Sequence, residues 1–350
     1  MVLLKNDGVL PVKKNTEKKQ KIFLTGPYAD SRQMLDSWSA YGEEKDCLTL
    51  REVLSDEMEI SCIPGIGILD YEKEQVENAV KAAEDSDIIL LALGEEPLMS
   101  GESNSRMDIG LPGYQQQFAE RIFAVGKPVI VILYNGRPLA IPEIALKANA
   151  VLEAWFPGTE GNHAVCDILT GAYAPSGRLT MSFPWAVGQC PIYYNCYSTG
   201  RPSKNVYISE RFSSRYIDGQ SVPLYPFGYG LTYTTFEYGE VILSDTVMRR
   251  NGSIMAQCSL KNTGDRAGTE TVQLYLQDIS GSRVRPVRML KDFRRITLKP
   301  GETCQAVFRI DEEMLKFHTL DKGFAAETGK FKIYIAENAS TGTCAEFELV

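Results

Sequence analysis

Several features that define common enzyme classes are scarce or absent in this sequence. The chain of 350 residues contains two histidines, His163 and His318, and no Gly-x-Ser-x-Gly pattern. A serine hydrolase triad therefore has no support, because it needs a histidine base beside an exposed nucleophilic serine. No Gly-x-Gly-x-x-Gly motif follows an apolar run, so a dinucleotide site is also disfavoured. The sequence predicts no cofactor and no metal ion.

Positive charge and long apolar runs are lacking as well. The formal net charge is −8, whereas nucleic-acid binding needs a basic face. No apolar run approaches the length of a membrane span. The first residues, MVLLKNDG, have neither the basic start nor the apolar centre of a signal peptide. We therefore expect a cytoplasmic protein that binds neither nucleic acid nor a membrane.

The eight cysteines form no recognisable framework. They are far apart and irregularly spaced, which fits neither a zinc site nor a compact disulfide scaffold. Several replace ordinary apolar residues; Cys166, for example, lies within a helical apolar pattern. We expect buried free thiols in a reducing compartment.

What the sequence does contain is an alternation of apolar strands and amphipathic helices up to about residue 175. The runs 88–93 and 127–133 are apolar without alternation, which is typical of strands buried on both faces of a parallel sheet. Apolar residues recur at helical spacing in 71–85, before the first run, and in 114–122, between the two runs. The pattern predicts an α/β three-layer sandwich with a mostly parallel sheet. Further elements are expected at 21–26 (strand), 48–54 (helix), 59–62 (strand), 150–155 (strand) and 162–169 (helix).

In the last third of the chain, apolar residues recur with a period of two. Residues 253–260, 271–276, 306–310 and 331–335 alternate as half-buried strands do, with turn clusters between them. They predict an all-β immunoglobulin or fibronectin III-like sandwich. Before it lies a stretch rich in tyrosine, proline and glycine, which we expect to be ordered because so many aromatics need a surface to pack on. The predicted organisation is a lead-in segment 1–20, an α/β domain 21–189, a connecting segment 190–235 and a sandwich 236–350.

A loop rich in charged residues follows the central predicted strand. After the strand 88–93 and Gly94 come the acids Glu95, Glu96, Glu102 and Asp108, together with Arg106. Ligands of open α/β sheets bind just beyond the carboxyl ends of the strands, so this loop is a candidate site. On composition alone, the preferred interpretation is a solvated surface loop that happens to be acidic.

Blocks spread along the whole chain resemble the C-terminal half of glycoside hydrolase family 3, the β-glucosidases and β-xylosidases. They stand in the family's order, and together they are far more specific than any one of them. The blocks are 3–11 (LLKNDGVLP), 135–139 (NGRPL), 154–161 (AWFPGTEG), 175–184 (PSGRLTMSFP) and 225–236 (YPFGYGLTYTTF).

The resemblance implies a retaining β-glycosidase whose site is shared between domains. The family plan is a (β/α)8 barrel, an α/β sandwich and, in many members, a fibronectin-like domain; the nucleophile is an aspartate of the barrel, so this chain has no matching residue. Glu102, in SGESNSR (100–106), matches the family's acid/base. Arg106 and Asp108 would then support the loop or bind sugar hydroxyls. The expected partners are a β-linked glucoside or oligosaccharide and a barrel domain in cis or in trans.

Several alternatives remain open at this stage. Glu95 or Glu96 could be the acid in place of Glu102, and Arg106 could simply pair with Asp108. The substrate could be a β-xyloside. The chain could also be a non-catalytic carbohydrate-binding or assembly module, or an inactive fragment. Without a barrel, its exposed domain face could lead to self-association.

Overall fold

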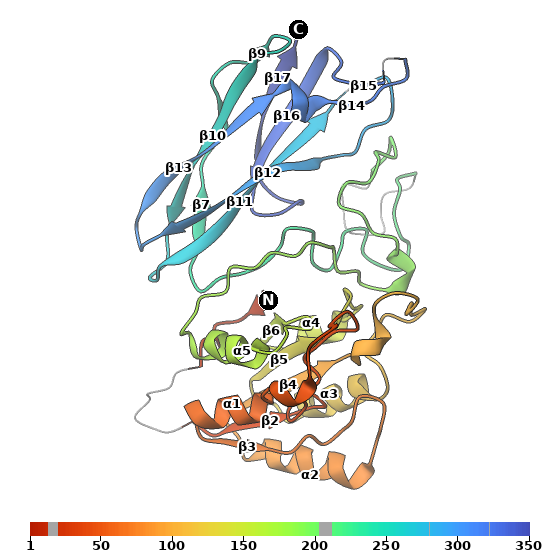
Figure 1. Cartoon of the computed structure of the whole chain (residues 1–350), viewed down its shortest axis with the longest axis vertical. Coiled ribbons are helices and arrows are strands. Elements are labelled where there is room, and N and C mark those ends of the chain that lie inside the picture. Colours follow the sequence, from red (N-terminus) through yellow and green to blue (C-terminus); the bar gives the residue numbers. More distant parts are fainter. Residues whose placement is uncertain (13–19, 203–211, 280, 322) are drawn as a thin grey trace. The chain divides into compact units, whose positions relative to one another are not determined.

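The computed structural model describes residues 1–12, 20–202, 212–279, 281–321 and 323–350 (Figure 1). These residues form two compact units. The first consists of Met1–Gly177 and Phe183–Cys190, and the second of Arg178–Ser182 and Pro191–Val350. None of the described helices is both long and apolar enough to cross a membrane.

The first unit is built on a six-stranded sheet in the order β1-β6-β5-β4-β2-β3. Five strands are parallel, and only the edge strand β1 runs antiparallel to its neighbour β6. β4 and β5 at the centre are buried along their whole length, as expected for strands covered on both faces. The strands are β1 (Val2–Asn6), β2 (Ile22–Thr25), β3 (Ile60–Cys62), β4 (Ile88–Gly94), β5 (Val129–Tyr134) and β6 (Ala150–Glu153).

Helices cover both faces of this sheet. α1 packs against α5, while α2 packs against α3 (Figure 1). This division follows from right-handed crossovers, because the chain moves outward from β2 to β3 and then back across the sheet through β4, β5 and β6. The helices are α1 (Leu50–Glu57), α2 (Lys73–Glu84), α3 (Gln115–Ala124), α4 (Pro142–Lys147) and α5 (Gly161–Thr170). Short 3-10 turns occur at η1 (Glu44–Asp46), η2 (Pro97–Met99) and η3 (Val187–Gln189).

The predicted α/β class is confirmed, with two differences in detail. Residues 2–6, assigned from sequence to a lead-in segment, form the edge strand β1 and pair with β6. The rest of that segment includes residues 13–19, which lie outside the described part. The short helix α4 was not predicted, because its six residues are too few to establish a helical period.

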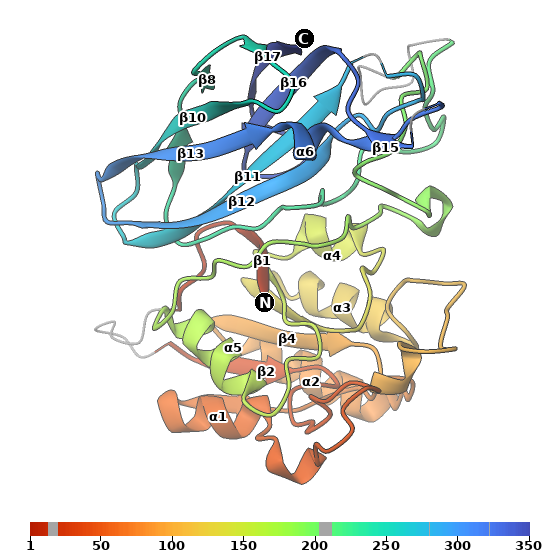
Figure 2. The same cartoon turned by 45° about the horizontal axis from the view of Figure 1, so that its top comes forward.

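The second unit is a β-sandwich, as predicted. One sheet has the order β13-β10-β7 with β8 beside β10, and the other has the order β12-β11-β16-β17-β9 (Figure 2). In β10 alternate side chains are buried and form a core with Phe308, Phe331 and Phe347 from three other strands. The strands are β7 (Phe236–Tyr238), β8 (Ile242–Leu243), β9 (Val247–Met248), β10 (Ser253–Asn262), β11 (Gly268–Asp278), β12 (Met289–Leu298), β13 (Thr303–Asp311), β16 (Gly329–Ala336) and β17 (Thr343–Leu349), with a small ribbon of β14 (Phe317–His318) and β15 (Phe324–Ala325) and a turn of helix α6 (Glu312–Leu315).

The described parts of the connecting segment, 191–202 and 212–235, belong to the sandwich unit. Tyr194 illustrates how its aromatics pack: the ring stacks on Phe227 at 4.1 Å between centroids and meets the edge of Tyr275. Residues 203–211 of the segment lie outside the described part of the chain.

All eight cysteines are free thiols, but the expectation that they are buried is correct only for some. Cys190, Cys196 and Cys344 are exposed. The first two lie in irregular chain, and Cys344 lies in the last strand, so none of them replaces a core residue. The buried thiols are Cys47, Cys166 and Cys258, while Cys62 and Cys304 are half-buried.

The topology places one part of the sheet in a special position. The connection from β2 goes to one side of the sheet, to β3, and the connection from β4 goes to the other side, to β5. The carboxyl ends of β2 and β4 are therefore a topological switch point, where the two loops diverge and leave a crevice. Glu95 is the first residue after β4.

Candidate active site

Four loops of the first unit meet at the carboxyl edge of the parallel strands. They follow β2, β4, β5 and β6, and together they enclose an open hollow of about 310 Å³. Its walls come from Asp36, Ser37, Trp38, Ser100, Gly101, Asn135, Gly136, Trp155 and Phe156. The loops touch so closely that a Cβ on Gly101 or Gly136 would lie 2.0–2.1 Å from a serine hydroxyl of the neighbouring loop.

Glu95 is the centre of a buried charged cluster beneath this hollow. Its side chain is completely buried, and its Oε1 lies 2.6 Å from Arg106 Nη1 and 3.0 Å from Arg137 Nε. Its Oε2 accepts from the Gly136 N–H at 3.3 Å. A buried carboxylate is stable only with such compensation. We call Glu95, Arg106 and Arg137 the Glu95 cluster.

The loop after β4 is tied down by Arg137. The Nη2 of this guanidinium donates to the carbonyl oxygens of Met99 and Asn104, the latter at 3.0 Å. The neighbouring loop adds a bond from the Ser37 hydroxyl to the Ser100 carbonyl at 3.0 Å. Arg106 completes the attachment through Glu95. The loop is thus fixed at both sides of residue 102.

Glu102 lies at the tip of the loop, on a tight turn. The Asn104 N–H donates to the Gly101 carbonyl, which makes Glu102 and Ser103 the two central residues. Gly101 and Ser103 have positive φ values of 106° and 64°, the first of which is natural for glycine alone. The Glu102 side chain is exposed, and no described residue forms a hydrogen bond or ion pair with it.

The other charged residues of the loop have different surroundings. The alternative that Arg106 pairs with Asp108 is wrong: Arg106 pairs with Glu95, and Asp108 is exposed and accepts from the Gly110 N–H in a local turn. Glu96 is half-buried at the start of η2, where its backbone carbonyl accepts from the Met99 N–H. Of the three glutamates, only Glu102 is exposed.

A second buried carboxyl lies at the end of β6. Glu153 is fully buried, and burial raises its pKa to about 8, although hydrogen bonds from the Trp155 N–H and the Asn135 amide act in the opposite direction. Glu153 is therefore mostly protonated at neutral pH. The Oδ1 of Asn135 is buried and has no partner among the described residues.

Sequence reasoning missed three residues of this arrangement. Arg137 and Asn135 were noted only as part of a family block, and Trp38 was not noted at all. Trp38 is 65% exposed beside the hollow. The sequence did contain a topological signal for these residues. Each loop that follows a predicted parallel strand begins at the same edge of the sheet as Glu95.

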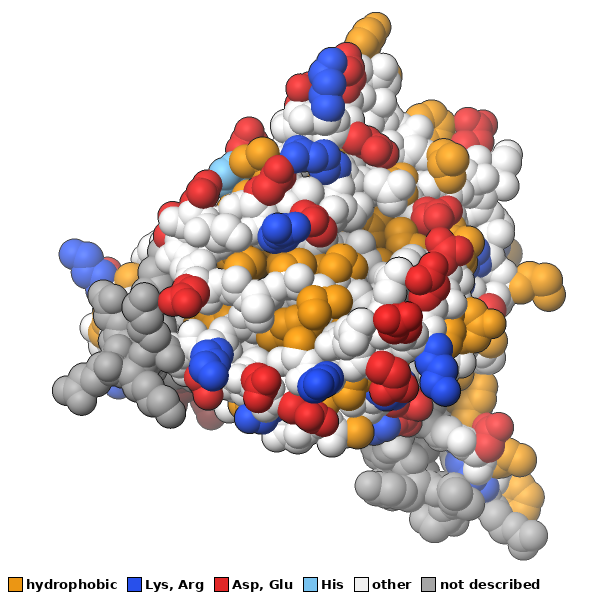
Figure 3. All heavy atoms as spheres, turned by 90° about the horizontal axis from the view of Figure 1, so that it is seen from below, with side chains coloured by type: hydrophobic (Ala, Val, Ile, Leu, Met, Phe, Trp, Pro, Cys, Tyr) orange, Lys and Arg blue, Asp and Glu red, His pale blue; other side chains and the backbone are white. Residues whose placement is uncertain are grey.

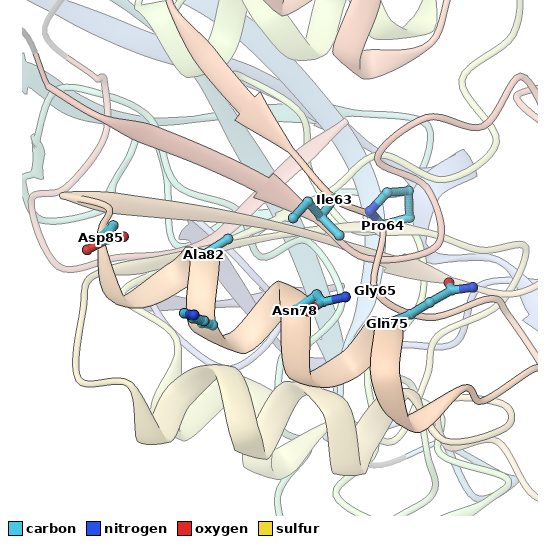
Figure 4. A pocket seen from close by; sticks show the side chains of 8 residues that line it. Ile63, Pro64, Gly65, Gln75, Asn78, Ala82 and Asp85 are labelled. Atoms are coloured by element: carbon cyan, nitrogen blue, oxygen red, sulfur yellow. The ribbon is translucent and has the colours of Figure 1, made fainter.

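A larger groove elsewhere on this unit is a weaker candidate. It holds about 530 Å³ between α2 and the residues after β3 (Figure 4). Its polar side chains, such as Gln75 and Asn78, come from α2 or, in the case of Asp85, from the residue after it, and all are exposed. Figure 3, seen from below the view of Figure 1, shows hydrophobic side chains near the middle of that view, with charged ones around them. Because no buried polar group converges on this groove, it has no evident chemistry.

Within the described ranges, no group of three or more histidine, cysteine, aspartate or glutamate side chains is placed to hold a metal ion.

Comparison with known proteins identifies the family. Residues 1–233 match the glycosyl hydrolase family 3 C-terminal domain, and residues 270–339 match a fibronectin type III-like domain. A periplasmic β-glucosidase of Salmonella typhimurium is 40% identical over 100% of this chain and 48% of its own length. A β-xylosidase of Formosa agariphila is 35% identical over 97% of this chain and 47% of its own.

Solved structures agree with this assignment. The crystal structure of a Listeria innocua β-glucosidase in complex with glucose superposes with a TM-score of 0.93 and 36% identity, over 99% of this chain and 48% of that one. The chain thus spans about half the length of the relatives it matches. It belongs to glycosyl hydrolase family 3, of which it contains the C-terminal α/β domain and the fibronectin type III-like domain.

Proposed function

We propose that this chain supplies the acid/base half of a retaining β-glycosidase site, with Glu102 as the proton donor. The observation that carries the proposal is a contrast within one loop. Glu95, where the loop begins, is buried and ion-paired, whereas the Glu102 carboxyl at the tip is exposed and has no partner among the described residues. A general acid must reach the leaving oxygen of its substrate. This role is supported by the exposure of Glu102 and by its position next to Gly101, which lines the hollow formed by four loops.

Retaining hydrolysis needs two carboxyl groups about 5–5.5 Å apart. In the first step Glu102 gives its proton to the glycosidic oxygen as the bond to the anomeric carbon breaks. In the second step the same group, now a carboxylate, removes a proton from the attacking water. The nucleophile that holds the sugar between the two steps comes, in this proposal, from an aspartate of a (β/α)8 barrel in cis or in trans.

The runner-up acids are less suited to this role. Glu95 is enclosed by two guanidinium groups and a backbone N–H, so its carboxylate has no free path to a substrate. Glu96 is half-buried at the base of the loop. Arg106 supports the loop through Glu95, and Asp108, which is exposed, remains a candidate for binding a sugar hydroxyl.

The hollow beside Glu102 suits a sugar. The exposed ring of Trp38 offers a flat apolar surface, while the exposed Asp36 carboxylate, which also lines the hollow, offers an acceptor for a hydroxyl donor. Carbohydrate recognition combines these two kinds of contact, apolar faces and a few placed polar groups. The substrate class we propose is a β-D-glucoside with a terminal non-reducing glucosyl residue; a β-xyloside is the alternative, since relatives of both names match the chain.

Reconstitution tests the proposal. The chain is assayed on an aryl β-glucoside and an aryl β-xyloside, alone and joined to a family 3 barrel domain. We expect turnover only in the joined form, and loss of that turnover with Glu102→Gln but not with Glu96→Gln. Full activity of the joined Glu102→Gln enzyme, or loss with Glu96→Gln alone, would assign the acid to another residue.

The exposure of Trp38 beside a ready hollow also favours a second candidate, a carbohydrate-binding module that works without catalysis. Calorimetric titration of the chain alone with glucose, cellobiose and xylobiose separates the two. Sub-millimolar binding that Trp38→Ala abolishes supports the module; no binding supports the half-site.

A further inference from the structure

We propose that Glu95 and Arg137 are positioning residues that set the location of the proton donor, an inference that rests on the proposed role of Glu102. Neither residue reaches the rim of the hollow. They act through the loop between them, which joins β4 to the turn at Gly101–Asn104. The Glu95 cluster would thus decide how well the acid is aligned with the leaving oxygen.

The first argument is the arrangement of hydrogen bonds around the tip. Arg137 donates to the carbonyls of Met99 and Asn104, which lie three residues before and two residues after Glu102. One guanidinium therefore joins the two sides of the loop at its neck. The planar fork of arginine can serve several acceptors in fixed directions at once, which a lysine ammonium on a flexible stem cannot.

The second argument is burial. The Glu95 side chain is fully buried, and the side chains of Arg106 and Arg137 are each 19% exposed. Two cations share one anion in this cluster, so Glu95 also prevents repulsion between the guanidinium groups. Replacing it by glutamine leaves both arginines without a counter-charge, a costly change in a buried site. The arginines would then move apart, and the loop with them.

The third argument concerns the attachment of the cluster to the sheet. Glu95 follows β4 directly, and its backbone carbonyl accepts from the Tyr28 hydroxyl at 2.5 Å. The Tyr28 ring stacks on Tyr134, at the end of β5, with centroids 4.7 Å apart. Positions given by buried strands are held more rigidly than positions within a loop. The cluster therefore transmits the geometry of the sheet to residue 102.

This role has a specific kinetic signature. Misplacement of a reacting group by about 1 Å can lower its contribution roughly 10²-fold. Proton donation matters for a poor leaving group such as methanol or phenol, but hardly for 2,4-dinitrophenolate, which leaves without a proton. A misplaced Glu102 should therefore reduce kcat/KM selectively for poor leaving groups, whereas general damage to the fold reduces it for both.

The experiment uses the chain joined to a barrel domain and compares phenyl with 2,4-dinitrophenyl β-glucoside. For Glu95→Gln and Arg137→Lys we expect kcat/KM to fall roughly 10- to 100-fold on the phenyl substrate and less than about threefold on the dinitrophenyl substrate. The control is Glu77→Gln, which removes an exposed ion pair between Glu77 of α2 and Arg121 of α3. This variant should change kcat/KM on neither substrate.

A second measurement does not need activity. Hydrogen exchange of the 350-residue chain should show faster exchange in 97–108 for Glu95→Gln and Arg137→Lys, with the central strands unchanged. Equal losses on both substrates, or unchanged exchange and kinetics, overturn the inference. If Glu102→Gln itself shows no preference for activated leaving groups, the proposed function fails, and the two failures are thereby told apart.

Discussion

Each unit of this protein buries an arginine–carboxylate cluster, and the two clusters do different things. In the α/β unit Glu95 pairs with Arg106 and Arg137. In the sandwich unit Glu270 of β11 pairs with Arg178 at 2.7 Å and accepts from the Tyr238 hydroxyl at 3.0 Å. In both clusters the carboxylate is almost or wholly inaccessible to solvent.

The difference lies in what the remaining hydrogen bonds hold. The Glu95 cluster stands at the carboxyl edge of a parallel sheet and binds the carbonyls of a loop whose tip is an exposed acid. The Glu270 cluster joins strand to strand and ties the segment 178–182 to the sandwich. A buried ion pair is therefore no sign of a functional site in itself; the indicator is the free group that it positions.

The largest contrast concerns Glu102, which we expect to affect chemistry and not folding. In the barrel-joined enzyme, Glu102→Gln should lower kcat/KM on an unactivated β-glucoside by roughly 10²–10⁴-fold, the usual contribution of a general acid. In the 350-residue chain the same change should alter the unfolding free energy by no more than about 0.5 kcal/mol, since the side chain is exposed and unpaired. Kinetics and urea unfolding measure the two effects. A stability loss larger than this would make Glu102 a structural residue.

The reverse is expected in the sandwich. Arg178→Met leaves the Glu270 carboxylate buried without its partner and should destabilise this unit by about 3–5 kcal/mol, as measured by chemical denaturation. The double variant Arg178→Met/Glu270→Leu should regain much of this loss, because no isolated charge then remains. A single variant as stable as the parent chain would show that the pair contributes only packing.

A more gradual effect is expected from pH acting on Glu153. Its pKa in the folded chain is about 8 because of burial, above the ordinary value of 4.5. The folded state thus keeps a proton that the unfolded state releases, so the α/β unit should lose stability as pH rises from about 4.5 towards 8. The slope should be at most about 1.4 kcal/mol per pH unit. Urea unfolding at several pH values should show it, and Glu153→Gln should remove it; an unchanged slope in that variant would assign the dependence to other groups.

Much of the fold was readable from sequence because its signals are local. The unbroken apolar runs of β4 and β5 and the helical spacing of α2 each lie within a single element. Less could be read where the pattern is short or mixed. β1 has five residues and includes Lys5, and β12 carries four charged side chains among its ten residues, so neither was predicted.

The site could be predicted only in part, for a related reason. The position of the loop and the candidate acid Glu102 followed from the end of β4 and from the resemblance to the family. The partner of Arg106 did not: its neighbour in sequence, Asp108, was the natural choice, while its actual partner Glu95 is buried eleven residues away. Arg137 reaches the same carboxylate from the next loop, and only the parallel arrangement of β4 and β5 brings the two together.

The most direct test of the central claim is chemical rescue of a variant without the proposed acid/base. In the barrel-joined enzyme with Glu102→Ala, 2,4-dinitrophenyl β-glucoside still forms the glycosyl-enzyme, but water reacts slowly without a base. Azide needs no base. We predict that sodium azide accelerates turnover and yields β-glucosyl azide, with no such product from Glu96→Ala. Absence of the azide product from Glu102→Ala, together with its formation by Glu96→Ala, would contradict the account.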